Sequence, residues 1–251
     1  MDRSEAGLDR IEAQRSTGVL PTEHTESVPK FLINIRLSDL FDPPGEYVLM
    51  SPKIFGAVIA GMGKEEWRRY SEPVTPLACL KSDGGDSVPH LAAAWGHLQL
   101  VESIVSECPS LFLELNSRDQ LPLHVAVQAG HIAVVKALVA TVTFLTATLS
   151  AERKERILNV YVVKDKDGDT ALHLACKDRN GETVACLVNA DQRASFLANK
   201  DGISPLYMAV EAGAVSLVKA MLKVTNNDGL EGRNSNLGLR LEGRNILYTL
   251  L

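Results

Sequence analysis

The chain has 251 residues, of which 45% are hydrophobic, so it is long enough to bury a core and to form one or two domains. Its formal net charge of −5 at pH 7 supplies no basic surface for a phosphate backbone, which excludes nucleic acid as the expected partner. The longest run without Asp, Glu, Lys, Arg or His, at 137–151, has 15 residues, fewer than the ~20 that a membrane-spanning helix needs. We therefore expect no membrane span in this chain.

Residues 1–30, within the expected tail of residues 1–45, are polar and charge-mixed and lack the apolar stretch of a signal peptide. This composition predicts a mostly disordered N-terminal tail. The four cysteines form no CxxC pair and no secreted-type framework, which indicates reduced thiols and a cytoplasmic location for the chain as given.

A sequence segment then recurs along the chain. It reads S-V-P-H-L-A-A-A-W-G-H at 87–97, L-P-L-H-V-A-V-Q-A-G-H at 121–131, T-A-L-H-L-A-C-K at 170–177 and S-P-L-Y-M-A-V-E-A-G at 204–213. The copies are 34, 49 and 34 residues apart, and a degenerate copy at 52–61 lies 35 residues before the first of them. A period near 33 with a T-P-L-H-x-A signature is typical of ankyrin repeats. The predicted fold class is therefore all-α, an ankyrin-repeat solenoid of about five repeats over residues 46–224, with the first repeat degenerate.

Each copy predicts two helices joined by a turn. Thr170 and Ser204 are expected to cap the first helices of their repeats. In three of the repeats, Gly96, Gly130 and Gly213 are expected to end the first helix. Second helices are expected at 98–107, 132–139, 182–188 and 215–223. Asp-Gly pairs at 83–84, 167–168 and 201–202 predict turns in hairpin-like loops between repeats.

Two departures from the repeat predict local differences. Arg179 stands where the other copies have the helix-ending glycine, which predicts an altered turn through Asn180 and Gly181. The longest interval between copies carries a surplus of 15 residues around 141–160. This insertion is expected to extend the second helix or to form a surface loop.

The histidines provide little support for catalysis or metal binding. His90, His124 and His173 occupy one first-turn position of the repeat, and His97 and His131 follow the helix-ending glycine. Zinc sites need Cys and His that converge at short spacings, whereas the repeat spreads these residues along a rod. We therefore interpret them as structural, and expect no metal, no cofactor, no catalytic residue and no enzyme activity.

The expected binding surface is the concave side of the stack, where first helices and loop tips are exposed. On the helices the candidates are Trp95, Gln128, Lys177, Asp178 and Glu211. At the loop tips they are Arg118, Asp119, Lys166, Asp169, Lys200 and Asp201. Trp95 has two interpretations, an exposed anchor for a partner or a side chain packed on the neighbouring repeat.

Three sequence segments resemble one particular family more closely than the general ankyrin pattern requires. They are H-L-A-A-A-W-G-H-L-Q-L-V-E-S-I-V-S-E-C-P-S-L at 90–111, R-L-S-D-L-F at 36–41 and A-N-K-D-G-I-S-P-L-Y-M-A-V-E-A-G at 198–213. With them the chain resembles plant accelerated-cell-death-type ankyrin membrane proteins from about residue 31 to its end. The resemblance implies a non-catalytic interaction module at the cytoplasmic side of the plasma membrane, in salicylic-acid-linked defence and cell-death signalling.

The resemblance also implies a C-terminal membrane domain in such proteins, which we expect to be absent from this chain. Residues 225–251 are expected to be a linker followed by the start of a truncated further repeat, because L-E-G-R-N occurs twice and I-L-Y-T-L-L follows the second copy. The expected partners are other proteins, full-length membrane relatives among them. The alternative function is a free-standing cytosolic ankyrin adaptor or an inhibitor of a signalling protein.

Overall fold

The computed structural model describes residues 28–33, 35, 40–41, 45–63 and 79–223. Within them the chain forms a solenoid of helix pairs. The first helices of the repeats are α1 (Pro52–Ile59), α3 (Val88–Ala94), α5 (Pro122–Gln128), α8 (Ala171–Lys177) and α10 (Pro205–Glu211). The second helices are α4 (Leu98–Glu107), α6 (Ile132–Thr148), α9 (Gly181–Ala190) and α11 (Val215–Lys223). The expected linker and truncated repeat, and residues 64–78 of the first repeat, lie outside the described residues.

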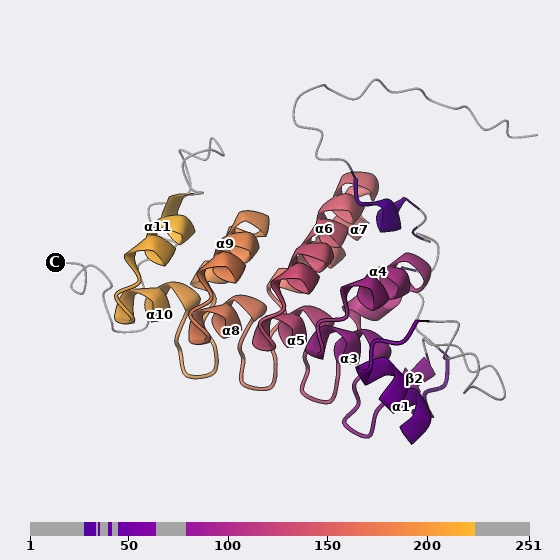
Figure 1. Ribbon diagram of the computed structural model, residues 1–251. Helices are drawn as coiled ribbons and strands as arrows, with labels where there is room; N and C mark the ends of the chain where they lie inside the picture. Colours follow the sequence, from indigo (N-terminus) through magenta and orange to yellow (C-terminus); the bar gives the residue numbers. More distant parts are fainter. Residues whose placement is uncertain (1–27, 34, 36–39, 42–44, 64–78, 224–251) are drawn as a thin grey trace, which may run out of the picture.

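The helix pairs stack side by side (Figure 1). First helices form one row and second helices the other, with α3 against α5, α5 against α8 and α8 against α10. Leu123, Leu172 and Leu206 hold successive equivalent places in the core and are at most 4% exposed. The alanines three residues after them, Ala126, Ala175 and Ala209, are also buried and let neighbouring helices approach closely. The ankyrin solenoid predicted from the sequence is confirmed.

The helix caps vary between repeats. The Ser204 Oγ accepts a hydrogen bond from the Tyr207 amide at 3.2 Å, as expected for an N-cap. The Thr170 hydroxyl instead pairs with the Nδ1 atom of His173, 2.9 Å away. This contact holds the His173 ring at the start of α8.

The turn at Arg179 keeps the form that it has elsewhere, so the predicted altered turn is wrong. Arg179 adopts a left-handed φ of 52°, as Gly96, Gly130 and Gly213 do at 71°, 75° and 64°. Its amide donates to the Cys176 carbonyl, and the next amide donates to the Ala175 carbonyl, as in the glycine repeats. The arginine therefore takes a glycine conformation instead of changing the turn.

The insertion is helical. α6 continues to Thr148, well past the expected end at 139, and α7 (Ala151–Leu158) folds back beside it before the short 3-10 helix η5 (Asn159–Tyr161). Leu145 and Ile157 are fully buried in this pair of helices. The extension of the second helix is confirmed, and the surface loop was the wrong alternative.

The chain before residue 46 contributes to the core as well. The 3-10 helix η1 (Lys30–Leu32) packs on α4, and Leu32 and Leu40 are fully buried. The guanidinium of Arg156 on α7 lies 4.2 Å from the ring centroid of Phe41. Packing therefore reaches back to Leu32, ahead of the expected boundary, whereas residues 1–27 lie outside the described residues.

Short elements complete the described fold. β1 (Val48–Leu49) and β2 (Leu80–Lys81) form a parallel pair with Val48 opposite Leu80. The 3-10 helices η4 (Pro109–Leu113) and η6 (Gln192–Phe196) follow α4 and α9. Together with the loops, these elements carry the chain back to the start of the next repeat.

Candidate protein-binding surface

The loops that precede the first helices share one backbone design and all project from the same side of the stack (Figure 1). The side chain that opens each loop accepts hydrogen bonds from amides further along it. Asn116 Oδ1 accepts from the amides of Arg118 and Gln120, both at 2.9 Å. Asp165 and Asn199 make the same two bonds in the next two loops. These side chains hold each loop tip in a fixed shape.

The fourth residue of each loop then adopts a left-handed conformation. Gly85, Gly168 and Gly202 have φ between 74° and 81°, and Asp119 has φ 58°. Turns therefore occur at all three predicted Asp-Gly pairs, and in the first loop the left-handed residue is Gly85, which follows the pair. In the second loop an aspartate takes this role, because Asp tolerates the left-handed region better than most residues.

Side-chain hydrogen bonds also connect each loop to the next, and we call this set the loop ladder. Asn116 Nδ2 donates to Asp86 Oδ1 at 2.7 Å, and Asn199 Nδ2 donates to Asp169 Oδ1 at 2.9 Å. Between them, Gln120 Nε2 donates to Asp165 Oδ2 at 3.4 Å. The loops therefore form one connected surface, not separate flexible tips.

Buried histidines tie the first helices to the loops. The Nδ1 atoms of His90, His124 and His173 accept hydrogen bonds from backbone amides at their own helix starts, at 3.0–3.3 Å. Their Nε2 atoms donate to carbonyl oxygens of the chain that leads into the next repeat, at 2.8–3.1 Å. Burial lowers the pKa of each ring, for His124 to about 4, so the rings are neutral at pH 7. The structural interpretation of these histidines is confirmed.

His97 and His131 join neighbouring repeats at the other end of the first helices. The His97 Nε2 lies 2.7 Å from the Ile59 carbonyl, and the His131 Nε2 lies 3.1 Å from the Ala94 carbonyl. Both rings pack against a glycine of the preceding repeat. A Cβ atom added at Gly61 or Gly96 would lie 2.6 Å from the ring Nδ1 atom. Each histidine therefore requires a glycine one repeat earlier.

The predicted helix candidates are all exposed. Trp95 ends α3 with 56% of its surface accessible, so within the described structure it is not packed away on the neighbouring repeat. Gln128, Lys177, Asp178 and Glu211 are exposed at the ends of α5, α8 and α10. Because these helix ends follow one another along the stack, the side chains form one exposed row.

Most of the tip candidates are exposed as well. Arg118, Asp119, Lys166, Lys200 and Asp201 are exposed at successive loops. The Lys200 ammonium donates to the Lys166 carbonyl, which leaves it less free for a partner.

Asp169 is the exception among the candidates, because it is only 1% exposed. It forms an ion pair with Lys177 and accepts from Asn199. Burial acts to raise the pKa of its carboxyl, but the hydrogen bonds from Lys177 and Asn199 outweigh this effect and lower it. Asp169 therefore supports the loop ladder and is not available as a contact.

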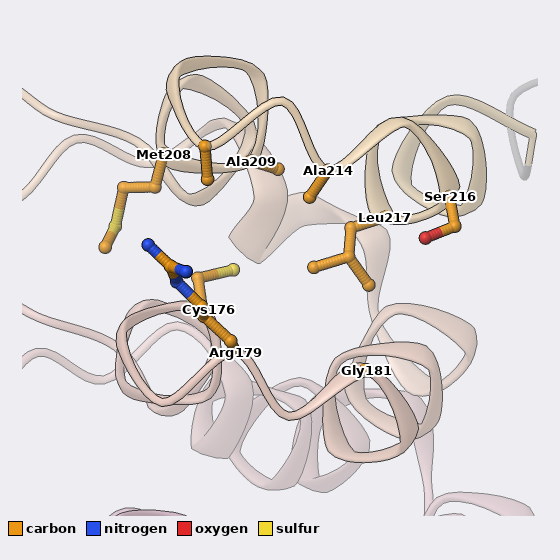
Figure 2. Close-up of a pocket in the computed structure, with 9 residues that line it drawn as sticks. Cys176, Arg179, Gly181, Met208, Ala209, Ala214, Ser216 and Leu217 are labelled. Carbon is orange, nitrogen blue, oxygen red and sulfur yellow. The ribbon is translucent and has the colours of Figure 1, made fainter.

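A cavity between the fourth and fifth repeats was missed by sequence reasoning (Figure 2). Arg179, Met208 and Leu217 line it, with small residues between them. One sequence signal was available, since Ala214 stands where the second and third repeats have His97 and His131.

Two other kinds of feature are absent from the described ranges. There, no group of three or more His, Cys, Asp or Glu side chains is arranged to hold a metal ion. In the same residues, no helix combines the length and the apolar character that crossing a bilayer demands.

Comparisons with known proteins agree with the repeat geometry. A model of ankyrin repeats in three copies matches residues 140–230, and a model of a single ankyrin repeat matches residues 118–143. The chain is an ankyrin-repeat protein. Ankyrin repeats form a non-catalytic interaction fold whose partners are proteins.

Three relatives of this ankyrin-repeat protein have names that refer to different processes or protein groups. It is 49% identical to Protein ACCELERATED CELL DEATH 6 of Arabidopsis thaliana over 98% of its own length and 40% of that relative. It is 27% identical to the Nuclear factor NF-kappa-B p105 subunit of Gallus gallus over 68% of its length and 17% of that protein. It is 28% identical to the human B-cell lymphoma 3 protein over 59% of its length and 30% of that protein. The chain thus spans less than half the length of each.

Proposed function

We propose that the chain is a protein-binding module of a plant defence and cell-death signalling system, acting at the cytoplasmic side of the plasma membrane. The supporting observation is the identity of 49% across nearly the whole chain to a relative whose name refers to accelerated cell death. The partner is another protein, full-length membrane relatives included. It binds the row of exposed helix ends and the adjoining loop tips.

Within this surface Trp95 is the expected anchor. A large aromatic side chain that is 56% exposed on an ordered helix end loses little entropy on binding and buries a large apolar area. Gln128 follows one repeat later and is expected to contribute hydrogen bonds at the edge of the same contact. The neighbouring charges at Arg118 and Asp119 favour specificity and association rate more than affinity.

The test is capture of partners from plant membranes with the full chain as bait. Trp95→Ala should weaken binding of the captured protein by about 30-fold, which corresponds to about 2 kcal/mol for a hot-spot residue. Gln128→Ala should have a smaller effect in the same direction. Gln99→Ala is the matched control, because Gln99 is exposed on α4, in the other row of helices. An equal loss of binding in all three variants, or no loss of binding in Trp95→Ala, would rule out this surface as the binding site.

A second candidate function is a free-standing adaptor or inhibitor of a soluble signalling protein. The observation that favours it is the similarity to the p105 subunit and B-cell lymphoma 3 protein, although at 27–28% identity. Capture from separated membrane and soluble fractions distinguishes the two. Trp95-dependent partners found in the soluble fraction alone would favour the adaptor.

A further inference from the structure

The cavity between the fourth and fifth repeats has a volume of about 220 Å³. It lies between the turns that join α8 to α9 and α10 to α11 (Figure 2). The Arg179 side chain extends toward Met208 beside Cys176, with Ala214 and Leu217 opposite. Protein pockets for small-molecule ligands usually measure ~300–1,000 Å³, so this space is better matched to a single side chain.

The equivalent place in two other interfaces shows what this space can hold. There, the imidazole of His97 or His131 lies in the inter-repeat contact and hydrogen-bonds a carbonyl of the preceding first helix at 2.7 or 3.1 Å. In the fifth repeat the same sequence position is Ala214, which has no ring. A flat ring with an N–H donor therefore fits this type of site, and here the chain does not supply one.

Arg179 gives the cavity its own chemistry. Because the fifth repeat has no histidine that would pack on residue 179, this residue does not have to be glycine. The Arg179 guanidinium therefore occupies part of the cavity. Guanidinium groups stack on aromatic rings, most favourably on the indole of tryptophan, and they repel a protonated imidazole. Burial raises the pKa of the Cys176 thiol to about 12, so this part of the wall is uncharged at neutral pH.

The cavity also adjoins the proposed binding surface. Lys177 and Asp178 directly precede Arg179, and Glu211 directly precedes Ala212 in the cavity wall. A protein bound along the row of helix ends would therefore pass the cavity mouth.

We propose that this cavity is a pocket that receives a tryptophan side chain of the partner protein. This inference rests on the proposed function, since it assumes a partner along the helix ends. The indole stacks on the Arg179 guanidinium and takes the place of the histidine that the fifth repeat lacks. Its N–H points to the Lys177 carbonyl, the counterpart of the Ala94 carbonyl in the third repeat's contact.

The pocket can be tested without the partner, by a titration of the full chain with N-acetyltryptophanamide. The chain has five methionines, so ¹³C-methyl labelling gives few signals, and one of them belongs to Met208 in the cavity wall. The Met208 methyl should shift and reach saturation at millimolar probe, with small shifts for the other four methyls. N-acetylalaninamide should leave all of them unchanged. Absence of a saturable Met208 shift would overturn the pocket.

A variant in which a histidine fills the cavity should lose binding of the probe. Arg179→Gly combined with Ala214→His rebuilds the glycine–histidine contact, so this variant should fold at least as stably as the parent and bind the probe at least tenfold more weakly. Arg179→Gly alone keeps the space and should weaken the probe about threefold. Gln99→His adds a histidine on the exposed side of α4 and is the matched control. Unchanged probe affinity in the double variant would overturn the proposal.

The role toward a partner is tested with the protein that the Trp95-dependent capture identifies. The double variant should bind it at least fivefold more weakly than the parent does, and equal binding would overturn that role. Because the methyl titration requires no partner, the pocket and the proposed function can fail separately.

Discussion

At the scale of single residues, Arg179 shows how a neighbour decides what a position tolerates. Its φ of 52° is a glycine conformation, and a non-glycine residue there costs ~1 kcal/mol. We expect Arg179→Gly to raise the free energy of unfolding by about 1 kcal/mol, measured by urea denaturation. Asp178→Gly is the control, since Asp178 has φ −81° and should lose stability on the same change. Stabilisation by both, or by neither, would contradict this explanation.

The buried histidines make stability depend on pH. Burial lowers the pKa of His124 in the folded chain to about 4, below the value of 6.5 for an unperturbed histidine. Below pH 6.5 the unfolded chain therefore binds the proton first, so stability is present above pH 6.5 and is lost as the pH falls toward 4. His124 alone should remove about 2 kcal/mol between pH 7.5 and 5, and His90 and His173 shift in the same direction.

Urea denaturation at the two pH values checks this expectation. His124→Gln supplies a side-chain amide that can still hydrogen-bond but cannot take up a proton. Its stability at pH 7.5 should be lower than that of the parent, while its further loss at pH 5 should be smaller by about 2 kcal/mol. The same loss in both proteins would show that His124 does not carry the effect.

At the scale of elements, the insertion and the N-terminal segment stabilise each other. Arg156 on α7 lies over Phe41, and Leu40 is fully buried next to that contact. Arg156→Ala should lower the free energy of unfolding by about 0.5–1 kcal/mol through the lost cation–π contact and speed hydrogen exchange in residues 30–33 and 40–41. Lys154→Ala, on the exposed side of the same helix, should do neither. In a Phe41→Leu background the effect of Arg156→Ala should disappear.

Repetition explains which elements the sequence could predict. The bounds of α4 and α11 were predicted to the residue, because capping, glycine and apolar spacing agree in each copy. The same logic predicted the candidate row at the helix ends. It could not find the docking of Leu32 and Leu40, since that contact occurs once and no second copy identifies it. The burial of Asp169 was missed because it depends on Asn199, a residue of the next loop.

At the scale of the whole molecule, each repeat depends on its neighbours for stability. In the described structure α8 packs against both α5 and α10, whereas α10 packs on α8 alone among first helices. Leu172→Ala should therefore cost about 2–5 kcal/mol and destabilise the centre of the array. Leu206→Ala should open α10 and α11 and leave the earlier repeats folded.

Hydrogen exchange resolved along the chain distinguishes these outcomes. In Leu206→Ala, fast exchange should be confined to residues 204–223, while α3 to α6 keep the protection of the parent. In Leu172→Ala, protection should fall on both sides of α8. Uniform loss along the array in both variants would indicate a single cooperative unit instead.

The loop ladder also limits how such a protein can evolve by shuffling its units. Each rung joins unlike groups, Asp86 with Asn116 and Asp165 with Gln120. A deletion that removed one unit, from residue 116 to 164, would bring Asp86 opposite Asp165 and face one carboxylate with another. The units of this array are therefore not interchangeable. Their order is constrained by the pairing of polar residues in the loops as well as by the packing of the apolar core.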